Sequence, residues 1–137
     1  MAGQLYWSRV FCRGTEEEFN ITMQGKYFHP SIFDDLPITD AAFCQRWDFV
    51  KTLLKDRRTN PSARNNEVLF RACHAGNMDV VKLLCEDKRV NCSVSDHTPI
   101  RIALENHHFD VARYLLNKTN ISETDFLLHS YRNYRNR

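Results

Sequence analysis

The chain repeats itself every 31 residues. Three similar segments start at that spacing: DFVKTLL at Asp48, DVVKLLC at Asp79 and DVARYLL at Asp110. Further columns at the same offset hold residues of one kind, namely Ala41, Ala72 and Ala103, and Ile38, Leu69 and Ile100. Agreement in several columns at one period indicates a structural repeat.

Each unit carries two apolar stripes with helical spacing. In the second unit, Leu69, Ala72 and Cys73 stand at i, i+3 and i+4, and a second stripe runs from Met78 to Cys85. Such spacing puts apolar side chains on one face of a helix. Because a helix pair with one stripe apiece cannot bury it alone, the units are expected to stack into an all-α solenoid.

The turns between the units repeat as well. Asp34, Asn65 and Asp96 each stand two residues before the first helix of a unit. Asp and Asn tolerate a left-handed backbone better than other non-glycine residues, so these positions predict tight turns. In the third unit, Thr98 and Pro99 have the pattern of an N-cap followed by proline at the first helical position.

The cysteines are odd in number and widely spaced: Cys12, Cys44, Cys73, Cys85 and Cys92. This pattern does not resemble a disulfide framework and favours a reducing compartment. Cys85 occupies the column of Leu54 and Leu116, which predicts a small apolar side chain in the core rather than a ligand. No cysteine pair has the spacing of a zinc site, so neither a metal nor a cofactor is expected.

No catalytic motif occurs in the sequence. The few glycines form no phosphate-binding loop, and neither His-Glu-x-x-His nor Gly-x-Ser-x-Gly is present. His107 and His108 fall at a junction between helices, where the pair is expected to cap or pack, with His108 exposed. We therefore expect a protein that is not an enzyme.

Charge and hydropathy restrict the partners and the location. Lys and Arg number 19 against 17 Asp and Glu, with both signs interspersed, so no strong field for nucleic acid or acidic lipid is implied. The first residues lack the pattern of a secretory signal, and no apolar run is long enough to span a bilayer. We expect a monomeric intracellular protein, cytoplasmic or nuclear.

Three segments resemble successive ankyrin repeats: LPITDAAFCQRWDFVKTLL, EVLFRACHAGNMDVVKLLC and TPIRIALENHHFDVARYLL. The period is shorter than the usual one of about 33 residues, so the turn fingers should be short. The glycine that ends the first helix remains only as Gly76 and is replaced by Gln45 and His107. The resemblance implies a helix-turn-helix solenoid of about three repeats, at residues 34–64, 65–95 and 96–121.

The two ends do not follow the repeat pattern. Residues 1–33 are rich in aromatics, fall outside the 31-residue register and are expected to cap the stack, with a partner-binding element as the alternative. Gln24 and Gly25 predict a hairpin turn. Residues 122–137 are expected to form a capping helix from Ser122 and a basic tail. The apolar side of that helix is predicted to hold Phe126, Leu127, Tyr131 and Tyr134.

The resemblance to ankyrin repeats implies protein binding through a concave surface of turn tips and first-helix side chains. Phe70 with Arg71 is the preferred hot spot, because an exposed aromatic beside an arginine is typical of binding anchors. Alternatively, Phe70 packs under a neighbouring finger. Alignment of the units predicts the partner-binding residues Asp35, Thr39, Asp40, Phe43, Arg64, Asn66, Phe70, Arg71, His74, Ser95, His97, Arg101 and Glu105.

Two other classes of function stay open. The tail interleaves Arg132, Arg135 and Arg137 with two tyrosines, a combination that stacks on bases and pairs with phosphates, although nucleic acid is the less expected partner. In the other class the chain is a structural fragment of a longer array, whose exposed apolar end would self-associate. The repeat predicts the scaffold, while the identity of a protein partner does not follow from it.

Overall fold

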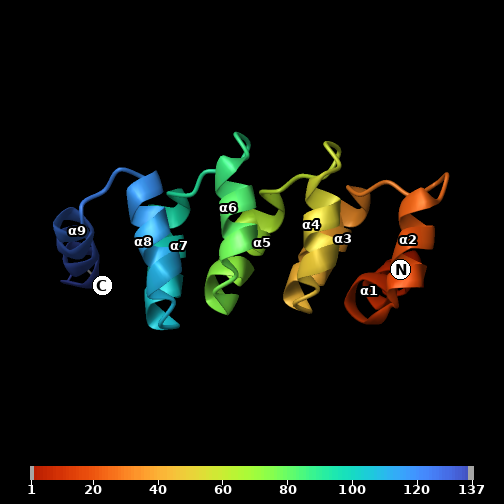
Figure 1. Cartoon of the computed structure of the whole chain (residues 1–137), viewed down its shortest axis with the longest axis horizontal. Coiled ribbons are helices and arrows are strands. Elements are labelled where there is room, and N and C mark those ends of the chain that lie inside the picture. Colours follow the sequence, from red (N-terminus) through yellow and green to blue (C-terminus); the bar gives the residue numbers. More distant parts are fainter. Residues whose placement is uncertain (1, 136–137) are drawn as a thin grey trace.

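The computed structural model describes residues 2–135, which form helices joined by short turns and contain no strand. The helices are α1 (Ala2–Arg13), α2 (Glu16–Gln24), α3 (Ile32–Phe43), α4 (Trp47–Leu54), α5 (Ala63–Ala75), α6 (Met78–Glu86), α7 (Val94–Glu105), α8 (Phe109–Lys118) and α9 (Glu123–Arg135). In Figure 1, α4, α6 and α8 stand in one row, and α3, α5 and α7 lie behind them. The predicted all-α solenoid of helix pairs is confirmed.

The core runs along the stack as columns of equivalent positions. The first helices contribute Ile38, Leu69 and Ile100, and the second helices contribute Leu53, Leu84 and Leu115, all fully buried. Burying a side chain of this kind stabilises a fold by about 1.5–3 kcal/mol. Each repeat buries the same pair of positions against its neighbours, which explains the period of the apolar residues.

The two helical layers are not equally close packed. The first helices α1, α3, α5 and α7 contact one another extensively in that order, whereas α4, α6 and α8 approach one another at few positions. Closer spacing on one side bends a solenoid toward that side. We call the exposed surface of α1, α3, α5 and α7 the inner face.

Each finger-like turn contains three consecutive left-handed residues, which interrupt the first turns of α3, α5 and α7 as a kink. The central residues Asp34, Asn65 and Asp96 have φ of 59°, 57° and 60°, as their Asx pattern predicts. Their neighbours are left-handed too, including Phe33 with φ of 52°. A non-glycine residue in this conformation costs about 1–2 kcal/mol. Contacts between fingers offset this cost, since the Arg64 guanidinium donates to the carbonyl oxygens of Phe33 (3.2 Å) and Asp34 (3.4 Å).

The first helices of the three repeats end with the same backbone geometry. Gln45, Gly76 and His107 have φ of 57°, 69° and 62°. In each case the N–H of the following residue donates to the carbonyl oxygen of an alanine near the helix end. Glycine is the usual residue at such an end, so Gln45 and His107 keep the turn while adding backbone strain.

His108 lies against Gly76 rather than in solvent. Its Nε2 is 3.0 Å from the main-chain oxygen of His74, and the residue is half-buried. The prediction that His108 is exposed is therefore wrong. Stacking of adjacent repeats brings this ring over the glycine, a contact that spacing along the chain does not reveal.

Replacing Gly76 with alanine is expected to destabilise the fold by about 2 kcal/mol, because alanine adopts a positive φ poorly. The new Cβ would also lie 2.4 Å from Nδ1 of His108. Gln45→Gly, at the equivalent position, is the matched control and should leave stability unchanged or raise it. Urea denaturation followed by circular dichroism measures both variants. A Gly76→Ala midpoint equal to that of the wild type would contradict the contact.

Residues 16–24 form helix α2, so the predicted hairpin around Gln24 and Gly25 is wrong. The helix starts with a capping box: the Glu18 N–H donates to Thr15 Oγ1 (3.1 Å), and the Thr15 N–H donates to Glu18 Oε2 (2.8 Å). The two reciprocal bonds satisfy N–H groups that the start of a helix otherwise leaves free. The Thr-x-x-Glu spacing is the sequence signal that reveals this helix start.

Helices α1 and α2 also keep the register of the repeats. The second helices of four successive pairs start at Glu16, Trp47, Met78 and Phe109, each 31 residues after the previous one. Residues 1–33 lack the sequence pattern because aromatics stand where the repeats have smaller residues, such as Phe11, 31 residues before an alanine. Their backbone therefore has the repeat geometry without the repeat sequence.

An aromatic cluster attaches this helix pair to the next one. Phe11 and Phe19 are almost fully buried, and the Phe19 ring stacks on that of Phe49 with centroids 3.9 Å apart. The guanidinium carbon of Arg46 lies 4.0 Å from the Phe49 ring centroid. The cluster covers the end of the apolar core and so supports the cap interpretation, which stays a prediction.

Helix α9 follows the last repeat at the C-terminal end. It starts after Ser122, whose Oγ accepts from the Asp125 N–H at 3.0 Å, as the sequence predicts. Phe126 is buried, but Leu127 is 63% exposed. The expected apolar side of this helix is thus only partly buried.

Four of the five cysteines are paired, which corrects the prediction that they form no disulfide framework. Cys12 is joined to Cys44 and Cys85 to Cys92, with Cα separations of 5.2 and 5.8 Å. Stacking of α1 on α3 brings the first pair together across 32 residues of sequence. Cys73 is free and fully buried in the core, as its place on the apolar stripe of the second unit predicts.

Candidate partner-binding surface

A shallow groove runs between α3 and α5. It has a volume of about 150 Å³ and is lined by Thr39, Asp40, Phe43, Arg64 and Glu67. The alignment of repeats predicts all of these as partner contacts except Glu67, whose sequence position resembles any solvated helix residue. The structure therefore brings part of the predicted set together at one place.

Phe43 and Arg71 form an exposed contact between two repeats. Phe43 is 60% exposed, and the Arg71 guanidinium carbon lies 4.6 Å from its ring centroid. Glu67 orients the arginine, since its Oε1 accepts from Arg71 Nε at 2.8 Å. A cation over an exposed aromatic ring contributes about 0.5–1 kcal/mol. The aromatic beside Arg71 is thus Phe43 of the preceding repeat, while the predicted Phe70 is half-buried.

The groove carries charges of both signs. Asp40 and Glu67 supply carboxylates, and Arg64 and Arg71 supply guanidinium groups. Ser8 of α1 donates to Asp40 Oδ2 at 2.5 Å, so the N-terminal helices hold one wall of the groove. Balanced charges favour a partner of mixed polar and apolar character over a polyanion.

Two of the predicted partner contacts are buried. Asp35 is 5% exposed and Thr39 3% exposed. The Thr39 hydroxyl donates to the carbonyl oxygens of Asp35 (3.2 Å) and Leu36 (3.1 Å) within α3. Asp35 Oδ1 accepts from the Asn60 N–H at 2.8 Å. These side chains offer almost no surface to a partner, which corrects their predicted role.

Burial raises the pKa of the Asp35 carboxyl, and the hydrogen bond from Asn60 opposes this shift. The native state therefore holds a proton that the unfolded state has lost, and stability falls as the pH rises between the two pKa values. Asp35→Asn keeps an acceptor for the Asn60 N–H and removes the buried charge, and asparagine already stands at the equivalent position 66. We expect this variant to be at least as stable as the wild type at pH 7. Its stability should also lack the decrease with rising pH that the Asp35 carboxyl causes.

Urea denaturation at several pH values between about 4 and 7 measures this effect. Asp35→Ala is the comparison, because it leaves the Asn60 N–H without its acceptor and should cost about 1–3 kcal/mol. Lower stability of Asp35→Asn than of the wild type at pH 7 would contradict the cost of the buried charge.

The other predicted partner contacts of the second repeat differ in their exposure and in the hydrogen bonds they already make. Arg64 is exposed, although its guanidinium already contacts the preceding finger. Asn66 is half-buried, and its Oδ1 has no hydrogen-bond partner among the residues that the structure describes. His74 is exposed next to the Arg71 turn of α5. Arg64 and His74 thus extend the surface around the groove.

The residues predicted from the third repeat do not line the groove. Ser95 and Glu105 are exposed, and Arg101 donates to a neighbouring threonine hydroxyl at 2.7 Å. His97 is half-buried, with its ring centroid 6.5 Å from that of Phe126. A partner that reaches these positions has to extend along the inner face beyond α5.

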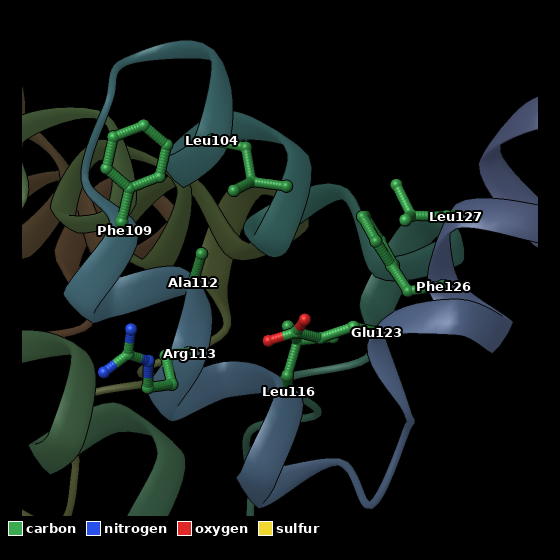
Figure 2. A pocket seen from close by; sticks show the side chains of 8 residues that line it. All are labelled: Leu104, Phe109, Ala112, Arg113, Leu116, Glu123, Phe126 and Leu127. Atoms are coloured by element: carbon green, nitrogen blue, oxygen red, sulfur yellow. The ribbon is translucent and has the colours of Figure 1, made fainter.

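A second, mainly apolar hollow opens between the last repeat and α9 (Figure 2). Its volume is about 340 Å³. Leu104, Phe109 and Leu116 line it from the repeat, and Phe126 and Leu127 line it from α9. The sequence alignment predicts none of these residues as a contact, because it compares positions on the inner face only.

Comparison with protein families identifies the repeats. A family model for ankyrin repeats (three copies) matches residues 38–125, more than half of the chain. The chain belongs to the ankyrin repeat family. Ankyrin repeats are generally protein-interaction modules and are typically non-catalytic. The matched residues start in α3, so α1 and α2 lie outside the ankyrin match although they keep its spacing.

Comparisons with curated proteins and with solved structures found no match. In the described range, residues 2–135, no helix is long and apolar enough to cross a membrane. Among the same residues, no group of three or more His, Cys, Asp or Glu side chains is placed to hold a metal ion. The candidate sites of this ankyrin stack are the groove between α3 and α5 and the apolar hollow beside α9.

Proposed function

We propose that this chain is a non-catalytic protein-interaction module that binds a partner protein through the inner face of its ankyrin stack. The groove between α3 and α5 is the centre of the site. The observation that carries the proposal is the exposed Phe43 ring with the Arg71 guanidinium over it. Aromatic residues and arginine are enriched among the side chains that carry binding energy.

Binding at this groove requires little ordering of the chain. Phe43 lies on α3, and Glu67 and Arg71 lie on α5, and these two helices pack extensively. The 2.8 Å ion pair between Glu67 and Arg71 already restricts the arginine side chain. Anchors held on rigid helices lose less conformational entropy on docking than anchors on loops.

The groove also predicts the chemistry of the contact. We expect an apolar or aromatic partner side chain on Phe43, flanked by polar groups that reach Asp40 and Arg64. Because the charges of the groove balance, salt should affect the association only weakly.

The double variant Phe43→Ala/Arg71→Ala tests the proposal. Affinity capture from a cell lysate identifies a partner, and titration of the purified pair measures Kd. We expect Kd to rise by about 30-fold in the double variant, equivalent to about 2 kcal/mol. Phe109→Ala is the matched control and should bind as the wild type does, because Phe109 is 59% exposed against 60% for Phe43 and lies outside the groove.

Thermal melts followed by circular dichroism establish that all variants are equally folded. Unchanged affinity of the double variant would contradict the groove as the binding site. Loss of binding in Phe109→Ala alone would place the site at the apolar hollow beside α9.

Exposed apolar side chains at the C-terminal end favour a second candidate function, end-to-end self-association. Phe109, Leu127 and Leu128 are 59%, 63% and 54% exposed. Clustered exposed apolar side chains favour contact with a second copy. Concentration-dependent sedimentation that disappears in Leu127→Glu would support this function, and a constant monomer mass over the same range would exclude it.

The nucleic-acid role of the tail stays a prediction. Arg132 and Arg135 are exposed. The side chains of Tyr131 and Tyr134, and all of Arg137, lie outside the described part of the structure. Binding that weakens steeply with salt and is lost on deletion of residues 130–137 would support this role.

A further inference from the structure

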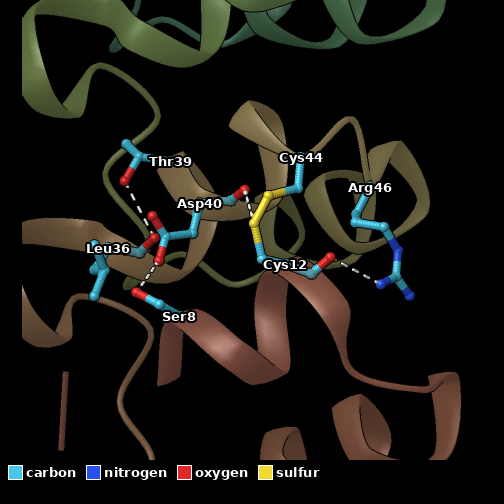
Figure 3. Close-up of a disulfide and its surroundings, with 7 residues drawn as sticks. All are labelled: Ser8, Cys12, Leu36, Thr39, Asp40, Cys44 and Arg46. Atoms are coloured by element: carbon cyan, nitrogen blue, oxygen red, sulfur yellow. Dashed lines mark hydrogen bonds between the residues drawn. A yellow bond between two sulfur atoms is a disulfide. The ribbon is translucent and has the colours of Figure 1, made fainter. Parts of the chain in front are cut away.

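A covalent bond joins the ends of two neighbouring first helices. Cys12 stands in the last turn of α1 and Cys44 caps α3, with their Cα atoms 5.2 Å apart. Figure 3 shows the bonded sulfur atoms beside Asp40. The Cα separation lies in the usual disulfide range of about 4.4–6.8 Å. The bond therefore links the N-terminal helix pair to the first matched repeat.

We propose that Cys12 and Cys44 form a reversible redox site that reacts with small-molecule disulfides, with glutathione disulfide as the reagent class. Closing the bond locks α1 and α2 onto α3. This site borders the partner-binding groove at Asp40, but its chemistry does not depend on a partner.

The Cys12–Cys44 pair is more accessible than the second cysteine pair. Cys12 and Cys44 are half-buried, whereas Cys85 and Cys92 are each only 8% exposed. Thiol–disulfide exchange requires direct access of the attacking sulfur to the disulfide. A small thiol or disulfide should therefore react with Cys12 and Cys44 first.

The surroundings also accommodate the reduced state. Cys12 Sγ lies 3.8 Å from the main-chain oxygen of Asp40, which can accept a hydrogen bond from the thiol. Arg46 Nη1 donates to the Cys12 carbonyl oxygen at 3.4 Å, and Ser8 Oγ donates to Asp40 Oδ2 at 2.5 Å. These contacts, drawn in Figure 3, hold α1 beside α3 without the covalent bond. The two sulfurs stay within reach of each other, so the bond can form again after reduction.

The reaction proceeds in two exchange steps. One protein thiolate attacks glutathione disulfide, forms a mixed disulfide and releases one glutathione thiolate. The second protein thiolate attacks the protein sulfur of this mixed disulfide and releases the second glutathione. Two protein thiols are oxidised, one glutathione disulfide is reduced, and the two thiol protons pass to the released thiolates.

The redox state should change the stability of the N-terminal helices most. The bond closes the segment 12–44, which contains α2 and α3, and it ties the end of α1 to this segment. Such a cross-link restricts the unfolded forms of the segment that it closes. Opening the bond should therefore promote local unfolding of α1 and α2 and leave α5 to α8 unchanged.

Alkylation with N-ethylmaleimide, read by mass spectrometry of peptides, tests the site in the wild-type chain. Cys12 and Cys44 of the reduced protein should lose labelling after exposure to glutathione disulfide. Reduced glutathione should restore their labelling at concentrations that leave Cys85–Cys92 closed. If glutathione disulfide left the labelling of Cys12 and Cys44 unchanged, the proposal would be overturned. Labelling of the buried Cys73 reports unfolding of the core. The proposal would also be overturned if the Cys12–Cys44 bond opened only when Cys73 became labelled.

Hydrogen exchange in the two redox states tests the locking role. Reduction should speed amide exchange in α1 and α2 by about tenfold and leave α5 and α6 unchanged. Cys44→Ser should exchange like the reduced wild type in both buffers, and Cys12→Ser serves as a second variant. Equal exchange of oxidised and reduced wild type, which needs no substitution, would overturn the locking role. None of these readouts requires a partner bound at the groove.

Discussion

Replacing Phe49 with alanine is expected to lower the free energy of unfolding by about 3–5 kcal/mol, the usual loss for a buried phenylalanine. Phe49 is 5% exposed, and its ring stacks on Phe19 with centroids 3.9 Å apart. The guanidinium of Arg46 lies over the same ring at 4.0 Å. The substitution leaves a cavity where α2 meets α4, so α1 and α2 should lose the most protection. Urea denaturation and hydrogen exchange measure the global and the local effect.

Two further variants make this prediction specific. Phe109→Ala removes the same side chain from a position that is 59% exposed, and should cost less than about 1 kcal/mol. Phe19→Ala should resemble Phe49→Ala, and the double variant should fall short of additivity by about 0.5–1.5 kcal/mol, the energy of an aromatic pair. Strict additivity would show that the stacked pair adds nothing beyond burial.

The stability of the wild type is expected to fall at alkaline pH because of Cys73. Burial raises the pKa of this thiol from 9.0 to about 12. Between these values the unfolded chain loses the thiol proton while the native state keeps it, so stability falls as the pH rises. The slope is about 1.4 kcal/mol per pH unit once the pH exceeds the unfolded pKa. At pH 8 the same shift lowers the thiolate fraction about a thousandfold, so alkylation of Cys73 should require unfolding.

Cys73→Ala is the matched control, because alanine occupies the equivalent position 42. Lysine and tyrosine residues titrate in the same pH range, so the difference between variant and wild type isolates the thiol. Urea denaturation between about pH 8 and 10.5 should show the variant losing less stability than the wild type. If the stability of the variant and of the wild type fell equally with pH, the raised pKa of Cys73 would be contradicted. Rapid alkylation of Cys73 in the folded protein would contradict it as well.

The repeat pattern predicted the architecture because each repeat has to bury the same positions. Ile38, Leu69 and Ile100 recur at the spacing of the stack and are all fully buried. The left-handed turns were predicted at their central Asx residues, but not at Phe33, whose side chain has no preference for that conformation. Arg64 of the second repeat donates a hydrogen bond to the Phe33 carbonyl oxygen and so holds the finger of the first repeat. Local backbone propensity does not predict such a contact between units.

Helices α1 and α2 have the backbone spacing of the repeats but different residue types. The helix start at Glu16 keeps the 31-residue spacing, and the Thr15 capping box marks it. Large aromatics such as Phe19, which stacks on Phe49, replaced the aliphatic pattern of the repeats. Apolar periodicity therefore does not reveal this helix pair, whereas the capping box at Thr15 marks the start of α2.

The candidate site was predicted only in part, because exposure was inferred from alignment alone. Asp40, Phe43 and Arg64, which the alignment predicts as partner contacts, line the groove, whereas Asp35 and Thr39 are only 5% and 3% exposed. The left-handed finger and the hydrogen bond from the next linker turn the Asp35 carboxylate inward. The exposure of a turn side chain depends on where the neighbouring unit packs, and the sequence of one unit does not contain this information.

Residue types alone predict the helix pairs, their 31-residue spacing, the buried columns and the likeness to ankyrin repeats, because positions buried at a fixed period carry apolar residues at that period. The contacts across repeats depend on how the units stack: Phe43 with Arg71, His108 with Gly76, and Cys12 with Cys44. Residues about 30 positions apart become neighbours only when the units stack. The surface for a partner and the redox pair both depend on those contacts.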